Sequence, residues 1–594
     1  MIDARQHAFS SGNVTVYKKL RNQVKREIEN SKVIYYADRV RNLQSIEPRK
    51  WHQEIRTMTR NVKSDLCIPV PGLDDSDHDK IANHINDAFV NVSSGIPPLN
   101  IATLEAFLPS SSPAPELYPW DVYAQLKKVK ATKARGPDGI LPKIIKEFAY
   151  EFSTPICDIL NSSYADGVVP TQWKKAIVVP IPKTNPPKSD KLRPVSLSDC
   201  FAKVAETFIT DWILEDISDK IDLQQYGNVK GVSTSHYLVS LLHFLHQGAD
   251  KVNNVGTVVL TDFSKAFDMV DHSLLIEKFI HIGVRRAIVP WLCDFLINRM
   301  QCVRYNSTLS VFKTLSGGLP QGTKLGPIGF QVIINDAVQN NSDPISCWKY
   351  VDDLTIAENR THSKPSKMQV TLDSFSQWTE NNNLKLNPAK CQALQICFKN
   401  NVPPPTELKI NGCSLSFVDH AKILGIWLQH DLTWDKNISE MISKTNRRLF
   451  MLRMLKRFGF KKDELITVYK GYIRPLLDYA DVVWHSSLTI KQAKSIEQVQ
   501  RRACRIVLGH KFISYNKALS DCEIVSLATR RDDHCLKFAK GLASIERTKD
   551  LIPPTRLECH SRNLRNAHNI SQLRFRTSRF KNSPIPHFIE LLNK

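Results

Sequence analysis

The sequence predicts an α+β fold in which a compact centre carries a helical N-terminal extension and a basic C-terminal extension. Within residues 120–430, short β-branched runs such as AIVVPI (176–181) and TVVL (257–260) alternate with helical stretches. After residue 436, apolar residues recur at helical spacing, which predicts an all-helical domain. The centre is near neutral and its flanks are cationic, so we expect the flanks to contact a polyanion.

These patterns divide the chain into five segments. A long charged stretch without Gly or Pro marks the first as helical, and Ser and Pro mark the second as a linker. In chain order they are a basic helical segment (1–93), a linker (94–119), a mixed centre (120–430, with its core at 164–430), a basic helical domain (431–510) and a basic C-terminal region (511–594).

The net charge of +22 is concentrated in three stretches. Residues 1–66 hold 14 Lys and Arg against 7 Asp and Glu, residues 436–510 hold 16 against 6, and residues 551–594 hold 8 against 2. Any one of these stretches could be an ordinary solvated face. Three of them around a neutral centre favour an enzyme core that is held on a nucleic-acid backbone by its periphery.

Several classes of protein are excluded. No apolar run approaches the roughly 18 residues needed to span a bilayer, and the N-terminus has no apolar signal segment. The 13 cysteines are scattered and include no CxxC pair, which favours a reduced intracellular protein over a disulfide scaffold.

Two segments place carboxylates beside apolar strands. The run NNVGTVVLTD ends on Asp262, and SCWKYVDDLTIA predicts a hairpin with Asp352 and Asp353 at its tip. If the two strands are neighbours, the three carboxylates converge and repel one another unless a divalent cation lies among them. Mg²⁺ prefers such oxygen ligands, and a pair of ions about 3.5–4 Å apart can clamp a phosphoryl displacement.

An Asp-Asp pair alone is a weak signal. The chain has three such pairs, at 74–75, 352–353 and 532–533. The outer two lie in polar surroundings, where a solvated cap or loop is the simpler interpretation. Only the pair at 352–353 is framed by apolar strands.

The order of motifs gives a more specific signal, because seven blocks resemble the reverse transcriptases of non-LTR (LINE-like) retrotransposons. They cover about residues 120–430, and the similarity continues more weakly to about residue 510. The blocks are KARGPDGI (133–140), WKKAIVVPIPKTNPPKSDKLRPVSLSD (173–199), LTDFSKAFDMVDH (260–272), GGLPQGTKLGP (317–327), YVDDL (350–354), NNLKLNPAKCQ (382–392) and KILGIWL (422–428).

The resemblance implies a right-hand polymerase, with fingers and an antiparallel palm sheet in residues 120–430 and a helical thumb in residues 431–510. The implied activity is RNA-directed DNA polymerisation, in which a primer 3′-hydroxyl is extended with dNTPs on an RNA template. The implied partners are therefore an RNA template, a DNA primer or target, and dNTPs, with no membrane. By the same resemblance we expect the protein in the nucleus.

The resemblance assigns catalysis to Asp262, Asp352 and Asp353. Asp262 and Asp352 are the implied principal ligands of two Mg²⁺ ions, for which Mn²⁺ could substitute. Phe263 is implied to add its backbone carbonyl as a further metal ligand.

Six residues are implied to bind the incoming nucleotide. Lys183 and Arg193 would reach its phosphates, although a charged hairpin loop is the alternative. A large ring at position 267 would exclude a ribose 2′-hydroxyl, unless this side chain simply belongs to the core. Lys390 would donate a proton to the pyrophosphate leaving group. The full set is Lys183, Arg193, Phe267, Gln321, Gly322 and Lys390.

Two further sets are expected to contact nucleic acid. Leu424 and Gly425, in KILGIWL, would grip the primer end by resemblance. The cations of the first thumb helix would contact the backbone of the duplex. These are Arg447, Arg448, Arg453, Lys456 and Arg457.

The sequence also departs from the family. Many relatives carry an N-terminal endonuclease, whereas the first 119 residues here are helical and linker-like, so we expect no such module in them. The primer would then come from existing nicks or a separate endonuclease, or the element would be immobile. Two alternatives stay open: an RNA-dependent RNA polymerase, against which Phe267 and YVDD argue, and a catalytically silent relic that only binds nucleic acid.

Overall fold

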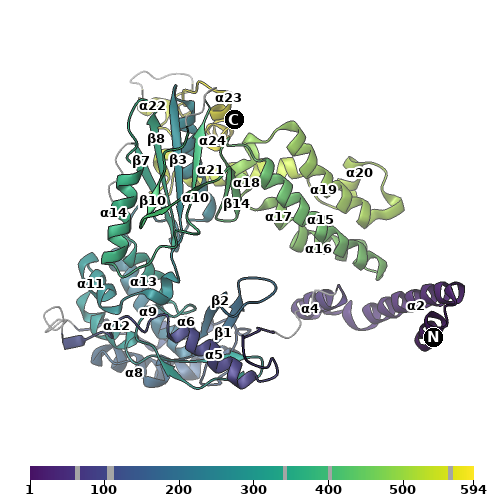
Figure 1. The fold of residues 1–594 in the computed structure, drawn as a ribbon, viewed down its shortest axis with the longest axis horizontal. Coiled ribbons are helices and arrows are strands. Elements are labelled where there is room, and N and C mark those ends of the chain that lie inside the picture. Colours follow the sequence, from purple (N-terminus) through teal and green to yellow (C-terminus); the bar gives the residue numbers. More distant parts are fainter. Residues whose placement is uncertain (60–66, 103–112, 339–343, 399–403, 560–565) are drawn as a thin grey trace. The chain divides into compact units, whose positions relative to one another are not determined.

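The computed structural model describes residues 1–59, 67–102, 113–338, 344–398, 404–559 and 566–594 (Figure 1). The chain divides into two compact units. The larger unit comprises Asp65–Asp419 and Ile545–Arg547, and the smaller unit comprises Met1–Ser64, His420–Ser544 and Thr548–Lys594. Helices and sheets are both present, which confirms the predicted α+β class.

The larger unit is built around a five-stranded sheet with the order β12–β9–β3–β8–β7, of which Figure 1 labels β3, β8 and β7. β3 lies in the middle and runs antiparallel to both β8 and β9. Val258 and Val259 are consecutive residues of β3, and both are fully buried. Because successive side chains of a strand point to opposite faces, both faces of β3 are covered. α10 (Thr234–Asp250) packs against β3, β7 and β8. The strands are β3 (Asn254–Thr261), β7 (Ile345–Tyr350), β8 (Asp353–Thr361), β9 (Gln392–Cys397) and β12 (Ser416–Phe417).

A second sheet contains the predicted run AIVVPI. This run lies in β1 (Lys175–Pro182), which pairs antiparallel with β2 (Leu192–Leu197) and parallel with β4 (Met300–Tyr305). Two short strands, β5 (Thr308–Leu309) and β6 (Lys313–Thr314), pair with β4. The β1–β2 hairpin carries the Pro-rich turn of the predicted phosphate-binding motif.

One hydrophobic core connects the helices of the larger unit with the central sheet. It includes Leu160 of α8, Trp291 of α12 and Val259 of β3, so the helical part and the sheet are parts of one packed body. The helices are α6 (Pro119–Lys127), α7 (Pro142–Glu147), α8 (Ala149–Asp166), α9 (Cys200–Ile217), α11 (His272–Ile282), α12 (Val289–Leu296), α13 (Leu325–Ile333) and α14 (Met368–Asn381).

The first predicted segment, residues 1–93, is split between the two units, because residues from Asp65 onward belong to the larger one. α5 (His78–Val90) packs against β4. Its apolar face, with Ile81 and Ile85, forms a separate cluster with Val178 of β1 and Val303 of β4. The apolar face of α5 therefore covers the second sheet. Helical periodicity alone does not reveal this long-range contact.

The smaller unit contains the predicted basic helices. Leu449, Leu452 and Leu455 of α15 are buried, as are Ile496 and Val499 of α19, as the helical spacing predicts. The helices are α15 (Asp435–Arg457), α16 (Lys462–Val468), α17 (Pro475–Asp478), α18 (Asp481–Trp484), α19 (Ile490–Leu508), α20 (Tyr515–Asp521), α21 (Leu527–Leu542), α22 (Arg556–Cys559), α23 (Ser578–Lys581) and α24 (Pro584–Leu592).

The N-terminal helices belong to this same unit. They are α1 (Ile2–Ser10), α2 (Val14–Tyr35), α3 (Leu43–Ile46) and α4 (Pro48–Met58). Tyr36 stacks on Phe460 with ring centroids 3.7 Å apart, and Arg41 donates a hydrogen bond to the carbonyl of Gly459 at 3.2 Å. Residues separated by more than 400 positions are thus packed together.

Part of the predicted linker, residues 103–112, lies outside the described residues. The end of the linker is ordered: Leu117 is buried and its backbone N–H donates to Asn161 Oδ1 at 2.9 Å. Among the helices that the structure describes, none is both long enough and apolar enough to cross a membrane.

Candidate active site

Three carboxylates lie at one end of the central sheet. β3 pairs with β8 as far as Thr261, the residue before Asp262. β7 and β8 form a hairpin whose two-residue turn ends in Asp352, and Asp353 begins β8. Facing residues of neighbouring antiparallel strands have Cα atoms about 4.5–5.5 Å apart. The register therefore brings Asp262 beside Asp352 and Asp353.

Burial and neighbouring negative charge raise the pKa of Asp352 and of Asp353. Burial raises the pKa of Asp353 to about 6, and the charges of Asp352 and Asp262 add to this effect. Burial and Asp262 also raise the pKa of Asp352, whereas Arg193 and Lys183 lower it. Clustered oxygens that repel one another are a suitable ligand set for Mg²⁺, which prefers hard oxygen ligands.

The segment after α14 holds Asp262 by its backbone as well as its side chain. The N–H of Asn387 donates to the Asp262 carbonyl at 2.8 Å, and the N–H of Asp262 donates to Cys391 Sγ at 3.4 Å. Lys390 Nζ pairs with Asp262 Oδ2 at 2.9 Å. The predicted proton donor therefore contacts a predicted metal ligand, and Cys391 is a contact that the sequence analysis missed.

Phe263 is fixed by its ring and its backbone. Its buried side chain lies edge-on to Phe330 and Phe375, with ring centroids 6.3 and 6.0 Å away. Its backbone forms an antiparallel bridge with Leu386. The residue that is predicted to offer a carbonyl to the metal is thus anchored in the core.

The turn that carries Asp352 has a strained backbone and a supporting residue that sequence reasoning missed. Val351 has φ +60°, which is unusual for a β-branched residue. Its N–H donates to Gln225 Oε1 at 3.1 Å, and the same oxygen accepts from the N–H of Gly227 at 2.8 Å. A Cβ on Gly227 would lie 2.6 Å from the Val351 nitrogen. Nothing in the local sequence QQYG distinguishes this glutamine from an ordinary loop residue.

The β1–β2 hairpin brings its two predicted cations toward the carboxylates. Arg193 faces Ile181 in the strand register, and the N–H of Lys183 donates to the Lys191 carbonyl at 2.8 Å. Both charges act on the pKa of Asp352, so both lie within electrostatic reach of it. This placement suits cations that bind a triphosphate next to a metal site.

Phe267 and Gln321 lie on two loops that are hydrogen-bonded to each other. The Phe267 ring stacks on Phe330 with centroids 4.9 Å apart, and its carbonyl accepts from the N–H of Leu319 at 2.7 Å. Gln321 Nε2 donates to Asp268 Oδ1 at 3.2 Å. One face of Phe267 therefore packs on the core while the side chain stays half-exposed.

Gly322 allows a close approach of two backbones. It has φ +127°, and a Cβ there would lie 2.5 Å from the carbonyl oxygen of Ser196 in β2. The N–H of Ser196 donates to the Gln321 carbonyl at 2.7 Å. Residues 321 and 322 are thus joined to the strand that carries Arg193.

The predicted primer-grip residues lie in the smaller unit. Leu424 and Gly425 form the turn between β13 (His420–Ile423) and β14 (Ile426–Gln429), with φ +43° and +95°. Tyr479 donates its hydroxyl to the Leu424 carbonyl at 2.5 Å, and a Cβ on Gly425 would lie 3.0 Å from the Tyr479 ring. The turn is therefore packed against an aromatic side chain of its own unit.

The predicted thumb cations are all exposed, but they occupy different surroundings. Lys456 Nζ donates to the Val507 carbonyl at 2.8 Å, and Arg448 donates to the Tyr472 carbonyl. Arg453 lines a surface hollow together with Arg502 and Arg505 of α19, which the sequence analysis missed. In two further hollows, Arg447 lies beside Ser443, and Arg457 lies beside Arg21 and Lys25 of α2.

One other cluster has metal-ligating side chains. His485, Asp532 and His587 place ligand atoms within 4.8 Å of one another. Arg531 Nε donates to His485 Nδ1 at 3.0 Å, so the proton of that ring lies on Nε2, which contacts Asp532 Oδ1 at 2.8 Å. Both ring nitrogens are thereby engaged, and the arrangement suits a hydrogen-bonded network rather than a cation site.

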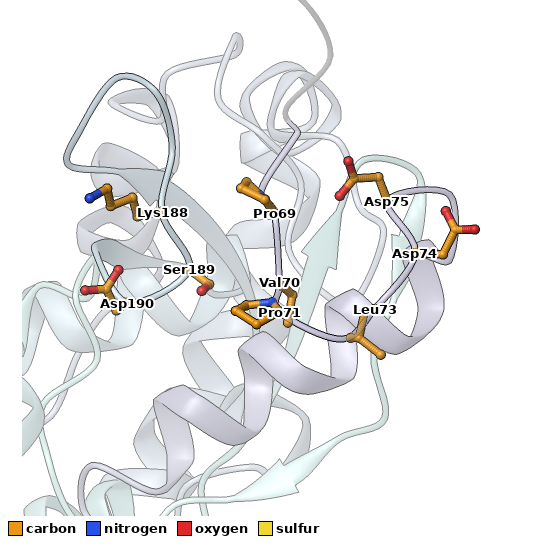
Figure 2. Close-up of a pocket in the computed structure, with 9 residues that line it drawn as sticks. All are labelled: Pro69, Val70, Pro71, Leu73, Asp74, Asp75, Lys188, Ser189 and Asp190. Carbon is orange, nitrogen blue, oxygen red and sulfur yellow. The ribbon is translucent and has the colours of Figure 1, made fainter.

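A hollow of about 580 Å³ is lined by residues other than Asp262, Asp352 and Asp353. Figure 2 shows it between the loop from Pro69 to Asp75 and the tip of the β1–β2 hairpin at Lys188–Asp190. None of its lining residues belongs to the predicted site.

Part of the chain is similar in sequence to known proteins. Residues 181–428 match the family described as "Reverse transcriptase (RNA-dependent DNA polymerase)". The chain is 27% identical over 403 residues to the "RNA-directed DNA polymerase from mobile element jockey" of Drosophila melanogaster, covering 63% of this chain and 43% of the relative. It is 24% identical over 449 residues to the "Probable RNA-directed DNA polymerase from transposon BS" of the same species, covering 72% and 49%.

Among solved structures, an apo telomerase from Candida tropicalis aligns with a TM-score of 0.32 and 11% identity, over 48% of this chain and 60% of that one. The chain spans less than half the length of the curated relatives that it matches. The main segment of the larger unit ends at residue 419. All blocks of the reverse transcriptase motif series that precede this residue lie in the larger unit. Residues 181–428 of the chain therefore match the reverse transcriptase family, and the chain is similar in sequence to the RNA-directed DNA polymerases of the Drosophila mobile element jockey, transposon BS and transposon X-element.

Proposed function

We propose that the protein is an RNA-directed DNA polymerase that extends a primer 3′-hydroxyl with dNTPs on an RNA template. The observation that carries this proposal is the convergence of Asp262, Asp352 and Asp353 at one end of the central sheet. The raised pKa of Asp352 and of Asp353, to which the charge of Asp262 contributes, supports a cation-binding role.

Asp262, Asp352 and the Phe263 carbonyl would hold two divalent ions, Mg²⁺ or Mn²⁺. When bound, such ions stabilise the charge on the attacking and leaving oxygens of a phosphoryl transfer. Asp353 would add negative charge to the site from the start of β8. The chain's own contribution is to fix these oxygens on a rigid sheet edge, so that little reorganisation is needed during the reaction.

The remaining predicted residues would orient the nucleotide. Lys183 and Arg193 would bind the triphosphate, and Phe267 would exclude a 2′-hydroxyl from the space beside its exposed face. Lys390 pairs with Asp262. From this position its ammonium would protonate the pyrophosphate leaving group.

The exposed cations of α15 would bind the nucleic-acid backbone, and the turn at Leu424 and Gly425 would contact the primer. Two observations support a polyanion-binding face: Arg453 shares a hollow with Arg502 and Arg505, and Arg457 shares one with α2 cations. Such contacts release counterions, so binding would depend strongly on salt and weakly on sequence.

Extension of oligo(dT) on poly(rA) tests this proposal. With dTTP and Mg²⁺ we expect labelled DNA from the wild-type chain and from Asp373→Asn, a control on the exposed face of α14. Asp352→Asn should give none. Extension with UTP in preference to dTTP would identify an RNA polymerase, and no extension by the wild type, with primer–template binding intact, would identify a silent relic.

A further inference from the structure

A short segment after the predicted thumb belongs to the larger unit. Ile545–Arg547 is part of that unit, although the residues on both sides of it are part of the smaller one. Arg547 Nε donates to the Gln225 carbonyl at 2.8 Å, across 322 positions of the sequence. Arg547 Nη2 donates to the carbonyls of Ile221 and Asp222, at 3.4 Å each.

These three carbonyls belong to one tight loop after α9. The N–H of Gln225 donates to the Asp222 carbonyl at 2.9 Å, which closes the loop on itself. The planar fork of a guanidinium can donate to several acceptors in one geometry, which a lysine ammonium on a flexible stem cannot reproduce. Burial lowers the pKa of Arg547, while Tyr226 and Asp222 raise it.

The same loop is joined to β7. The N–H of Tyr226 donates to the Lys349 carbonyl at 2.8 Å, and the N–H of Lys349 donates to the Gln224 carbonyl at 2.9 Å. The Lys349 side chain is fully buried and pairs with Asp222 Oδ2 at 2.6 Å. Lys349 lies two residues before Val351.

The loop also holds the strained turn directly. Gln225 Oε1 accepts from the N–H of Val351, whose φ of +60° persists only where its surroundings fix it. Asp352 is the next residue. A displacement of Gln225 would therefore change the direction in which the Asp352 carboxylate points.

We propose that Arg547 is a positioning residue for the catalytic turn. By fixing the backbone of Gln225, Arg547 fixes the side-chain oxygen that holds Val351, and through it the orientation of Asp352. This inference rests on the proposed role of Asp352 as a metal ligand. The segment Ile545–Arg547, which follows the predicted thumb in the sequence, thereby supports the proposed metal site.

The test compares Arg547→Ala, Arg547→Lys, Gln225→Ala and the Arg547→Ala/Gln225→Ala double variant in the full chain. Lys540→Ala, an exposed cation of α21, serves as the charge-matched control. Two quantities are measured: the Mg²⁺ concentration for half-maximal extension, and the hydrogen exchange of peptides that contain Tyr226, Lys349 and Val351.

We expect both Arg547 variants to raise the half-maximal Mg²⁺ concentration by about tenfold, as for other residues that orient metal ligands. Both should speed exchange in those peptides, and Lys540→Ala should do neither. The double variant should be no worse than Gln225→Ala, because both changes act through one contact.

Any of three results would overturn the proposal. They are wild-type behaviour of Arg547→Lys, additive effects in the double variant, and unchanged hydrogen exchange in the three peptides. Arg547→Lys keeps the charge and the aliphatic stem, so the test does not depend on the alanine variant folding. If the wild-type chain fails to extend primers, the proposed function fails, but the exchange comparison still tests whether Arg547 holds the turn.

Discussion

The carboxylate end of the central sheet and the cationic faces of α15 and α19 differ in how their functional groups are held. Asp262 is fixed through its N–H, its carbonyl and its side chain, and the turn at Asp352 is fixed by Gln225. Arg447 and Arg453 are exposed side chains on a helix surface. A site that aligns atoms for bond formation needs fixed geometry, whereas a surface that attracts a polyanion needs mainly charge.

This difference predicts the largest effect for a change of one catalytic carboxylate. Asp352→Asn removes the charge of a proposed metal ligand, worth several kcal/mol, so we expect extension to fall about a thousandfold or more. Primer–template affinity, measured by fluorescence anisotropy, should stay unchanged because the proposed role of Asp352 is to hold ions and not to grip the duplex. A parallel loss of affinity and rate would place Asp352 in the binding surface instead.

The next effect concerns the sugar. Phe267→Val should allow ribonucleotides to be incorporated about tenfold more readily, with little change for deoxynucleotides. The reason is that the smaller valine side chain no longer excludes a 2′-hydroxyl. The two rates are measured with dTTP and UTP on the same primer–template.

If Phe267 served only the core, the outcome would differ. Loss of its stacking on Phe330 would leave a cavity, lower the melting temperature and reduce both rates together. The ratio of the two rates therefore separates a gate from a core residue.

A smaller effect should appear in the pH dependence of stability. The pKa of Asp353 is 3.8 in the unfolded chain and about 6 in the folded protein. At a pH between these two values, the folded state therefore binds more protons than the unfolded state. The metal-free protein should therefore lose stability as pH rises from about 4 to about 6, by less than the full shift implies because solvent screens the exposed Asp353 side chain. Urea unfolding at several pH values measures this loss.

Asp353→Asn should weaken that pH dependence, since the amide does not titrate. At pH 7, Mg²⁺ should restore stability to the wild-type chain by binding the folded state alone. An equal pH dependence in the wild type and in Asp353→Asn would show that other groups cause it.

The smallest effect is expected on the cationic surface. Arg453→Ala should weaken primer–template binding and reduce the slope of log affinity against log salt by about 0.9, the value for one phosphate contact on B-DNA. Extension at saturating primer–template should be unchanged. An affinity that stays flat between low and moderate salt would contradict the electrostatic interpretation.

Much of the site could be predicted from the sequence because its signals are local. An apolar strand that ends on Asp262 and a hairpin with Asp352 at its tip are both visible in short windows, and sheet pairing then brings them together. The amphipathic helices after residue 436 could be predicted for the same reason.

The supporting contacts could not be predicted. Gln225 lies 126 positions from Val351, and Arg547 lies 322 positions from Gln225. Each is a single polar side chain in an unremarkable loop, and its partner is a backbone group that carries no sequence signal. The packing of α5 on the second sheet is likewise a long-range contact of an ordinary amphipathic helix.

Electron paramagnetic resonance of bound Mn²⁺ tests whether Asp262, Asp352 and Asp353 form a two-ion polymerase centre. The sample is the full chain with dTTP and a primer–template whose primer ends in a dideoxynucleotide, which blocks extension. We predict a spin-coupled Mn²⁺ pair, consistent with ions about 3.5–4 Å apart, that disappears in Asp262→Asn and Asp352→Asn. Isolated Mn²⁺ signals that are the same in the wild type and in both variants would contradict the claim.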